Sequence, residues 1–594
     1  MYVLGINPGH DATVALIKDE KVISAIAEER LSRIKNHFGF PYLAIEKILT
    51  DHELKASIID KVVFSFYDLF SFNKNFTNEI LFGRGRFAFS DTIPSYMRYR
   101  IVYSNILRFL SLKNYDPDKD NYRYAVLKYD EVMTKLGLNC PVELIDHHMS
   151  HAASAYYSQS RDKVLVITID GSGDGLCASV SIAEKGKITR CYASKDDNSP
   201  GVFYSAITKY LGFKRLKHEG KITGLAAFGK RTGAYDILKS VFYMTKDKRD
   251  FIIDLKNDGT KGKIKYIENL LLGSFVPGIK SNDLIDFFRK KFSEFSRDDI
   301  AWAAQQLLEE NVVEYVRKAV LETGINDIAL AGGVFANVKL NQAIAELNCV
   351  NYVYIHPNMS DGGTSFGSAM MAIKGNKAEN RQWKDVYLGP SYEVADIEVL
   401  TKGNNVEVIT DSVIAHTAKL LADGKVIAVM NGRMEYGPRA LGNRTILVSA
   451  KDKNINDILN KKLKRTEFMP FAPIIMEEYF DDYFCRPHAN INETLKYMTI
   501  TVNVKDICIQ KAPAICHVDN TARPQVVNRD INKGVYDILN EYHKITGVPL
   551  MVNTSFNVHE EPIVCDIKDA LMAFKQSKLD GLLIDNKYLL INRS

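Results

Sequence analysis

Residues 164–175 read Val-Leu-Val-Ile-Thr-Ile-Asp-Gly-Ser-Gly-Asp-Gly, a mostly apolar run that stops at a cluster of aspartates and glycines. An apolar run with this many β-branched residues predicts a buried strand. A second junction of the same kind follows at residues 328–333, where Ile-Ala-Leu-Ala closes on Gly-Gly. Backbone N–H groups at such junctions can approach phosphates. The two junctions therefore predict an α/β fold with a ligand site at the ends of its strands.

The segments around these junctions predict two α/β units. At the start of the chain, two short apolar strands flank the turn at residues 9–11, a pattern typical of antiparallel hairpins. An amphipathic helix is predicted over residues 299–322. The Gly, Asn, Lys and Pro of residues 374–412 favour a linker, and a second unit begins near residue 413 with a helix and a buried strand. We detect no internal repeat in the sequence.

Length and composition narrow the class of protein. With 594 residues the chain is too long for one hydrophobic core. A net charge of +5 is small for this length and argues against a general nucleic-acid binder. The eight cysteines form no C-x-x-C pair, which favours reduced thiols in the cytoplasm. The amino terminus does not resemble a signal peptide and no apolar run reaches about 18 residues, so we expect no membrane association.

Residues 66–137 are rich in Phe, Tyr, Arg and Lys. A basic and aromatic stretch can bind single-stranded nucleic acid. The alternative is a helical insertion that packs its aromatic rings inward and leaves its charges in solvent. We favour the insertion, because aromatic residues in helices usually belong to a core.

Residues 146–151, Asp-His-His-Met-Ser-His, are the sharpest signal in the first half. On a helix, His147 and His151 stand at positions i and i+4, so both imidazoles face one side and can share a metal ion. Asp170 and Asp361 lie at glycine-rich turns and are candidate carboxylate ligands. Two histidines with carboxylates suit Fe(II), Mn or Zn. The alternative is that the histidines merely line or cap a helix.

The turn at the start of the chain carries His10 and Asp11 directly after Gly9. A histidine with a pKa near neutrality can act as a general base on an acceptor hydroxyl. The alternative is an ordinary histidine in a surface turn.

The second half contains a loop, residues 431–444, in which three arginines stand among three glycines after a predicted buried strand. Planar guanidinium groups bind phosphate oxygens in pairs, and glycines let the backbone approach a ligand. Solvated surface charges are the alternative, although apolar, Gly and Pro residues frame this set. No Walker A loop is present. Further cationic and polar residues follow in three short motifs: Lys464 and Arg465; His517, Asp519 and Arg523; Asn553 and Ser555.

These motifs together resemble the NodU/CmcH-type O-carbamoyltransferases from the first residues nearly to the last. The resemblance rests on an ordered series of motifs: GINPGHDATVAL, HHMSHAASA, DGSGDG, EGKITGLAAFG, AGGVFANVKLN, GRMEYGPRALGNRTIL, KRTEFMPFAP, HVDNTARPQ and NTSFNVHEEPIV. So many motifs in one order make chance an unsatisfactory explanation. They are specific for the family and not for the substrate.

The resemblance implies a fold of two parts. Residues 1–385 would form a Kae-like domain of the actin-like type, with the helical insertion at about 66–137. Residues 386–412 would be the linker, and residues 413–594 would form a YrdC-like α/β domain. The YrdC-like domain would convert carbamoyl phosphate and ATP to carbamoyl adenylate, releasing pyrophosphate and phosphate. The Kae-like domain would then transfer the carbamoyl group to a hydroxyl and release AMP.

The resemblance also implies roles for individual residues. The metal ligands would be His147, His151, Asp170 and Asp361, with Fe(II) as the expected ion. His10 would assist deprotonation of the acceptor, next to Asp11. In the other half, Arg439 and Lys464 would act on the phosphates during catalysis. The remaining contacts to nucleotide and carbamoyl phosphate would come from Gly332, Gly333, Asn337, Asn341, Arg433, Arg444, Arg465, His517, Arg523, Asn553 and Ser555. Met469 stands where the family pattern usually carries another arginine.

Other functions stay open at this point. An actin-like kinase would use ATP directly and would leave the arginine-rich half without a role. Transfer of a threonylcarbamoyl group to tRNA uses related domains, but the modest charge argues against a tRNA substrate. A non-catalytic nucleotide-binding module gives no reason for the histidine pair. We expect a small-molecule or sugar hydroxyl as acceptor, Mg²⁺ with the ATP, no nucleic-acid partner, and a homodimer by base rate.

Overall fold

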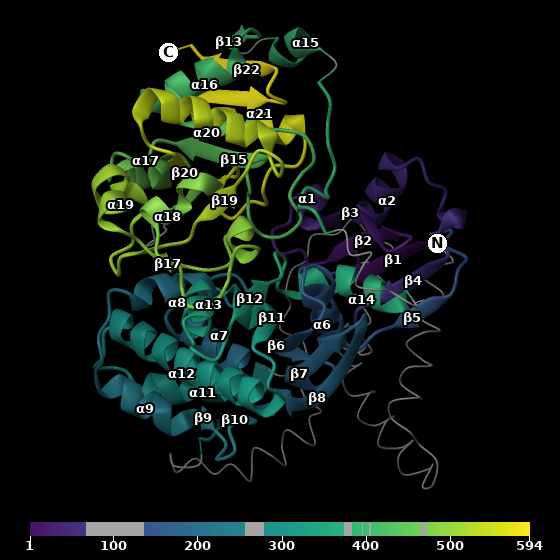
Figure 1. The fold of residues 1–594 in the computed structure, drawn as a ribbon, viewed down its shortest axis with the longest axis vertical. Helices are drawn as coiled ribbons and strands as arrows, with labels where there is room; N and C mark the ends of the chain where they lie inside the picture. The colour runs from purple at the N-terminus through teal and green to yellow at the C-terminus, as the bar shows by residue number, and fades with distance from the viewer. Residues whose placement is uncertain are drawn as a thin grey trace.

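The computed structural model describes residues 1–66, 136–255, 278–373, 383–394, 396–402, 405–464 and 471–593. Three large sheets organise this part of the chain (Figure 1). Two five-stranded sheets belong to the first half, and one eight-stranded sheet belongs to the second. The predicted α/β class is confirmed. The basic and aromatic insertion predicted between residues 66 and 137 lies almost entirely outside the described residues.

The first sheet has the strand order β3-β2-β1-β4-β5. Its opening strands pair antiparallel, as the hairpin pattern predicts, and β4 and β5 add in parallel. Five consecutive residues of β1 are buried, because this strand lies in the middle of the sheet with packing on both faces. The bounds are β1 Tyr2–Asn7, β2 Thr13–Lys18, β3 Lys21–Ala27, β4 Lys61–Phe64 and β5 Val142–Leu144.

The second sheet repeats this topology. Its order is β12-β11-β6-β7-β8, in which β6, β7 and β8 form an antiparallel meander and β11 and β12 add in parallel beside β6. The first half is therefore a structural duplication, although the sequence shows no repeat. This is the arrangement expected of an actin-like domain. The bounds are β6 Val164–Gly173, β7 Leu176–Glu184, β8 Lys187–Lys195, β11 Asp327–Ala331 and β12 Tyr352–Ile355.

Two helices lie between the duplicated sheets (Figure 1). Helix α6, His147–Tyr157, packs on β6 and β11, and helix α14, Thr364–Ala372, packs on β1 and β2. The helices cross very closely, because a Cβ atom on Gly367 would lie 1.8 Å from the carbonyl oxygen of Ser150. A Cβ on Gly5 would likewise lie 1.9 Å from the carbonyl oxygen of Ser365. Glycine at these contacts lets the two sheets approach each other through the helix pair.

The remaining helices of the first half cover the outer faces of the sheets. The predicted long helix is confirmed as α12, Arg297–Thr323, which begins at the N-cap Ser296 and ends at Gly324 with φ of 67°. The other helices and short strands are α1 Glu29–Ser32, α2 Tyr42–Asp51, α7 Pro200–Tyr210, α8 Glu219–Ala226, α9 Gly233–Val241, α11 Gly278–Lys291, α13 Val338–Ala345, β9 Phe242–Met244 and β10 Phe251–Ile253.

The second half is built on the eight-stranded sheet β13-β22-β21-β14-β15-β20-β16-β19. Helices α16 and α20 pack against each other and against this sheet. The strands are β13 Val406–Ile409, β14 Ile427–Met430, β15 Arg444–Val448, β16 Ala472–Met476, β19 Gln525–Val527, β20 Leu550–Ser555, β21 Gly581–Ile584 and β22 Tyr588–Asn592. The helices are α16 Val413–Ala422, α17 Ile455–Lys462, α18 Phe480–Tyr483, α19 Asp506–Lys511, α20 Lys533–Thr546 and α21 Ile567–Gln576. A small separate ribbon joins β17 Val502–Asn503 to β18 Thr521–Ala522.

The predicted linker, residues 386–412, is partly structured. It contains α15, Ile397–Thr401, and its strand β13 pairs antiparallel with β22 in the eight-stranded sheet. This part of the linker therefore belongs to the sheet of the second half. Pairing with a strand almost two hundred residues away leaves no local signal in the composition.

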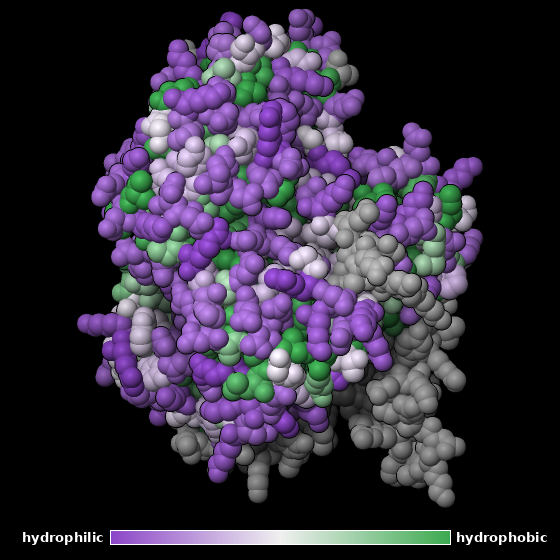
Figure 2. Space-filling model, viewed as in Figure 1, coloured by the Kyte–Doolittle hydropathy of each residue, from purple (hydrophilic) through white to green (hydrophobic). Residues whose placement is uncertain are grey.

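The two halves also meet directly. The N–H of Val353 in β12 donates to the carbonyl of Asn490 at 3.0 Å, and the N–H of Asn490 donates to the carbonyl of Asn351 at 2.8 Å. The visible face of the molecule is largely hydrophilic with scattered hydrophobic side chains (Figure 2). Within the described residues, no helix is both long enough and apolar enough to cross a membrane.

Candidate active site

Helix α6 presents the paired histidines at its first turn. The N-cap Asp146 accepts a hydrogen bond from the N–H of Met149 at 2.8 Å, and the carboxylate of Asp174 accepts from the N–H of His147 at 2.8 Å. Both carboxylates satisfy N–H groups that a helix start leaves without partners. The helix therefore begins at His147 itself, which fixes the direction of that side chain and places His151 one turn later.

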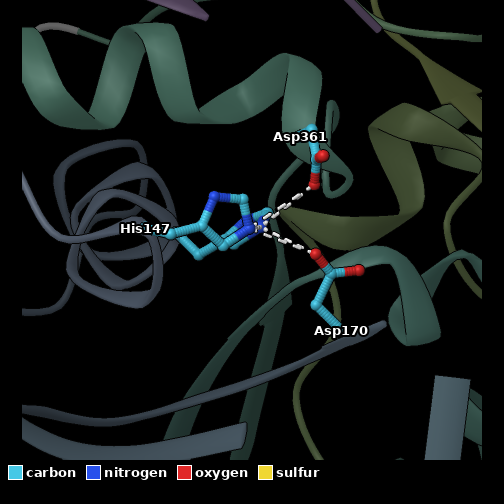
Figure 3. Close-up of side chains that lie close together, drawn as sticks. His147, Asp170 and Asp361 are labelled. Atoms are coloured by element: carbon cyan, nitrogen blue, oxygen red, sulfur yellow. Dashed lines mark hydrogen bonds and ion pairs between the residues drawn. The ribbon is translucent and has the colours of Figure 1, made fainter. Parts of the chain in front are cut away.

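Four side chains from three distant segments converge there (Figure 3). His147 Nε2 lies 3.1 Å from His151 Nε2 and 3.2 Å from Asp170 Oδ2. Asp361 Oδ1 lies 3.6 Å from His147 Nε2 and 3.5 Å from His151 Nε2. Asp170 comes from β6, and Asp361 comes from the turn directly before α14. The close crossing of α6 and α14 therefore brings the predicted set together.

This donor set fits a divalent cation. Four ligands bound at about 2.0–2.1 Å in a tetrahedron lie about 3.3–3.4 Å apart, close to the separations found here. Two Nε2 atoms 3.1 Å apart, facing two carboxylates, form a concentration of lone pairs that a cation stabilises. His147, His151, Asp170 and Asp361 thus form a possible metal site, whose nitrogen and oxygen donors suit iron, manganese or zinc.

Glycines make room for the cluster. A Cβ atom on Gly173 would lie 2.0 Å from Cδ2 of His147, inside the imidazole ring's contact distance. A Cβ on Gly333 would lie 2.8 Å from Asp170 Oδ1, the oxygen that accepts the N–H of Gly333 at 3.1 Å. Gly333 therefore holds the second carboxylate oxygen and leaves Oδ2 facing the histidines.

Burial and charge act against each other at the cluster. Burial lowers the pKa of His147, but its hydrogen bond to Asp170 and the charges of Asp361, Asp170 and Asp174 outweigh this and raise the pKa to about 9. Burial and the neighbouring charge of Asp170 raise the pKa of Asp361 above its usual value. A cation held by these groups would replace the proton on His147 and relieve the repulsion between the carboxylates.

The third histidine of the motif has a different environment. His148 is fully buried, and its ring nitrogens lie 2.7 Å from the hydroxyl of Thr168 and 3.1 Å from the carbonyl of Leu176. Burial, with the charges of His147 and His151, lowers its pKa to about 3. His148 is therefore a neutral core residue, whose ring nitrogens are turned to Thr168 and Leu176 and not to the cluster.

His10 and Asp11 form a second group near the cluster. His10 Nδ1 lies 3.2 Å from Asp11 Oδ2, which also accepts from the hydroxyl of Ser360 at 3.2 Å. Asn36 donates to the other oxygen of Asp11 at 3.1 Å. Burial lowers the pKa of His10, but Asp11, Asp361 and Asp170 outweigh it and raise the pKa to about 9. The structure thus links His10 to Ser360, the neighbour of Asp361.

The residues after β11 that are predicted to contact a nucleotide have different environments. Gly332 adopts φ of 105°, and a Cβ there would lie 2.2 Å from the carbonyl oxygen of Ile169. Asn337 caps α13 by accepting the N–H of Leu340 at 3.1 Å. Asn341 is fully buried, and its amide donates to the carbonyls of Phe335 and Thr499, each at 2.7 Å. The amide nitrogen of Asn341 therefore joins the two halves.

Arg444 in the second half is likewise committed to structure. Its guanidinium is fully buried and donates to the carbonyls of Asn431 at 2.7 Å, Gly432 at 3.2 Å and Cys565 at 3.3 Å. Its position does not support the predicted phosphate contact. A guanidinium has five N–H donors, and this one donates to loop carbonyls that would otherwise be buried without partners.

Arg433 also donates to backbone. Its Nε bonds to the carbonyl of Gly389 at 3.0 Å, and Nη2 bonds to the carbonyl of Ile23 at 2.9 Å. It lines a cavity of about 630 Å³ between β3, residues 383–388 and the start of α20. None of the other residues predicted to bind phosphate lines this cavity. The structure therefore separates Arg433 from them and gives it a bridging position between the halves.

The other predicted residues differ in their exposure and in their contacts. Arg439 and Arg523 are partly exposed, and Lys464 is exposed at the end of α17. Arg465 and Met469 lie outside the described residues. His517 Nδ1 lies 3.1 Å from Asp519, and Asp519 pairs with Lys339 of α13 at 2.8 Å. Asn553 is buried and bonds to the carbonyl of Ala440 at 3.2 Å, while the hydroxyl of Ser555 donates to Asn557 at 2.7 Å.

Glu435, which no sequence motif indicates, shapes the arginine loop. Glu435 is buried, and one oxygen accepts the N–H groups of Leu441 at 2.7 Å, Asn443 at 2.8 Å and Arg444 at 3.1 Å. This carboxylate folds the loop back on itself, so that Arg439 stands at its turn. A lone acidic residue among three arginines is the signal that could have indicated this role.

The sequence is similar to known proteins along most of its length. The carbamoyltransferase N-terminus family model matches residues 2–370, and the carbamoyltransferase C-terminus model matches residues 418–591. Nodulation protein NolNO of Sinorhizobium fredii is 29% identical over 98% of this chain and 79% of its own length. An uncharacterized protein of Methanocaldococcus jannaschii, MJ1051, is 32% identical over 98% of both chains. A solved structure of HypF matches with a TM-score of 0.31 and 15% identity, over 62% of this chain and 55% of that one.

Both family models lie on the two halves described above, and the first contains the histidine and aspartate cluster while the second contains the arginine loop. The chain therefore belongs to the carbamoyltransferase family.

Proposed function

We propose that this protein is an ATP-dependent O-carbamoyltransferase. Carbamoyl phosphate is hydrolysed to carbamate and phosphate, and carbamate attacks the α-phosphate of ATP to give carbamoyl adenylate and pyrophosphate. An acceptor hydroxyl then attacks the carbamoyl carbon, AMP leaves, and the hydroxyl proton passes to a base. Family membership supports the group that is transferred, and the side chains support the division into two steps.

The observation that carries this proposal is the position of His10 and Asp11 beside the four-residue cluster. Because Asp11 accepts from Nδ1 of His10, Nε2 is the ring nitrogen that would exchange a proton with the acceptor. A cation bound by the cluster would offset the charges of Asp361 and Asp170 that raise the pKa of His10, so that Nε2 could lose its proton and act as a base. A divalent metal bound by His147, His151, Asp170 and Asp361 would supply a Lewis acid for the carbonyl or the acceptor oxygen. Acyl-type transfer to a hydroxyl requires both a base and an electrophilic partner.

The first step is assigned to the second half. Departure of pyrophosphate develops negative charge that fixed cations stabilise. Arg439, Arg523 and Lys464 keep at least part of their side chains exposed, and Arg439 stands in the loop that Glu435 organises. Arg444 and Arg433 hold the loop and its neighbours through carbonyl contacts, so they act as support for the other cations.

The test separates the two steps with two variants. Protein, carbamoyl phosphate, ATP with Mg²⁺, and Fe(II) are mixed without acceptor, and pyrophosphate is measured. We expect slow pyrophosphate release that survives His147→Ala and is lost in Arg439→Ala. The reverse pattern would contradict the assignment of the steps. ADP in place of AMP would favour an actin-like kinase, and retention on tRNA at physiological salt would favour threonylcarbamoyl transfer.

A further inference from the structure

We propose that Arg30 and Asn36 are positioning residues that couple the arginine loop of the second half to His10 and Asp11. They belong to the segment after β3, residues 28–37, which we call the strut. This inference rests on the proposed function, because it assigns the two ends of the strut to the two chemical steps. It also gives a physical reason why transfer follows activation. Neither site provides this reason by itself.

The first contact of the strut is made by Arg30. Its side chain is only 3% exposed, and Nη2 donates to the carbonyl of Gly437 at 2.9 Å. Nη1 lies 3.2 Å from Glu29 Oε1. Gly437 stands two residues before Arg439 and has φ of 111°, so the carbonyl that Arg30 binds lies within the turn that presents Arg439. A displacement of this turn moves the partner of Arg30.

The second contact leads to the base. Glu29 Oε2 accepts the N–H of Asn36 at 2.6 Å, and the Asn36 amide donates to Asp11 Oδ1 at 3.1 Å. Asp11 Oδ2 lies 3.2 Å from His10 Nδ1. Hydrogen bonds and ion pairs of 2.6–3.2 Å therefore connect the loop of Arg439 to the imidazole of His10, with an ion pair alone as the link between Arg30 and Glu29.

The same loop also touches the segment that carries Asp361. The hydroxyl of Tyr436 donates to the carbonyl of Gly362 at 3.1 Å, and Thr13 donates to the same carbonyl at 2.8 Å. A Cβ on Gly437 would lie 3.1 Å from the carbonyl oxygen of Pro357. The loop is thus fixed against the transfer site on one side by packing and on the other side by the strut.

Burying an arginine side chain costs free energy, because its charge must leave water. An apolar side chain would serve if the strut only packed the halves together. Arg30 instead contacts both the carbonyl of Gly437 and the carboxylate of Glu29, and so orients these two groups relative to each other. Because carbamoyl adenylate hydrolyses readily, a base held in place only when the first site is correctly formed would limit loss of the intermediate to water.

The experiment compares how the two steps respond. Pyrophosphate release reports the first step, and carbamoylation of glycerol, used as a probe hydroxyl, reports the second. For Asn36→Ala we expect pyrophosphate release within about twofold of the unmodified protein and transfer to glycerol reduced about tenfold or more. Ile34→Ala is the matched control, since Ile34 lies in the strut but is 52% exposed, and we expect it to change neither rate.

Arg30→Met keeps most of the side-chain volume and should shift the ratio in the same direction. The double variant should lose no more transfer than the worse single variant, because both substitutions break one series of contacts. Equal loss of both rates, or losses that multiply in the double variant, would overturn the inference. If Arg30→Met does not fold, Asn36→Ala alone decides. Absence of pyrophosphate from the unmodified protein would instead contradict the proposed function.

Discussion

The histidine and aspartate cluster of the first half and the arginine loop of the second half differ in how their predicted residues are used. All four residues of the cluster point their donor atoms at one place. In the loop, Arg444 and Arg433 donate to backbone carbonyls. Arg439 stands at the turn of the loop, with part of its side chain exposed.

The difference follows from the chemistry of the side chains. An imidazole or carboxylate has few contacts to make, so a buried set that converges has little to bind except a cation or a proton. A guanidinium has five donors and can satisfy a whole loop of carbonyls. Residue type therefore predicts that imidazoles and carboxylates converge better than it predicts which arginines are left to bind phosphate.

The largest expected effect is on the cluster. In His151→Ala, affinity for Fe(II) should fall at least about 100-fold and transfer should be lost, because one of four donors is removed. His148→Ala is the matched control and should keep the metal while losing about 1–3 kcal/mol of unfolding free energy from its broken contacts. Anaerobic calorimetric titration and thermal unfolding measure the two quantities. If both variants lost metal affinity equally, the conclusion that His147 and His151 bind the metal while His148 does not would be contradicted.

Measurements of unfolding free energy can distinguish Arg444, which supports the loop, from Arg439, which is predicted to act on phosphate. Arg444→Met should lower the free energy of unfolding by about 3 kcal/mol or more, since several buried carbonyls lose their donor. Arg439→Ala should change it by less than about 1 kcal/mol and abolish pyrophosphate release. Denaturant unfolding of both variants decides the matter. If the Arg444→Met protein were as stable as the unmodified protein but bound ATP poorly, the predicted contact between Arg444 and the phosphates would be supported instead.

A single methyl group should disturb the cluster by displacement alone. In Gly173→Ala the new Cβ would meet the ring of His147, whose closest atom is 2.0 Å from the ideal position, and metal affinity should fall about 10–100-fold. At Gly171, two residues earlier, nothing lies within 4 Å of a Cβ, so Gly171→Ala should bind metal normally. Metal titration of the pair tests this, and equal affinities would show that His147 can move without loss.

The smallest effect is a gradual dependence on pH. The pKa values of His147 and His10 rise to about 9 in the metal-free protein, from an ordinary value of 6.5. Their contribution to stability is therefore complete below pH 6.5 and is lost as the pH rises through about 9. Metal affinity should move oppositely and increase by up to about tenfold per pH unit, because His147 must lose its proton to bind. Proton release measured during titration in two buffers checks this, and affinity independent of pH would contradict it.

Much of the local structure could be predicted from the sequence because its causes are local. The hairpins at the start, the buried strand that ends near Asp170 and the helix that pairs His147 with His151 all follow from patterns over a few residues. The duplication of the first half could not be predicted, since the two sheets share topology while their side chains have diverged. The place of β13 in the distant sheet was missed for a related reason, because strand pairing depends on packing against its neighbour.

The sequence by itself determined the family of the chain, because its ordered motifs match both family models. It also placed His147 and His151 on one side of a helix, because they stand at positions i and i+4. Only the tertiary structure decided which residues are free to use their chemistry. Arg444 and Asn341 carry suitable groups but are buried, and the guanidinium of Arg444 and the amide nitrogen of Asn341 donate to carbonyls. Glu435 and Asn36 carry no motif of their own and gain their roles from neighbours far away in the chain. A side chain's donors and acceptors are set by its type, but their partners are set by the fold.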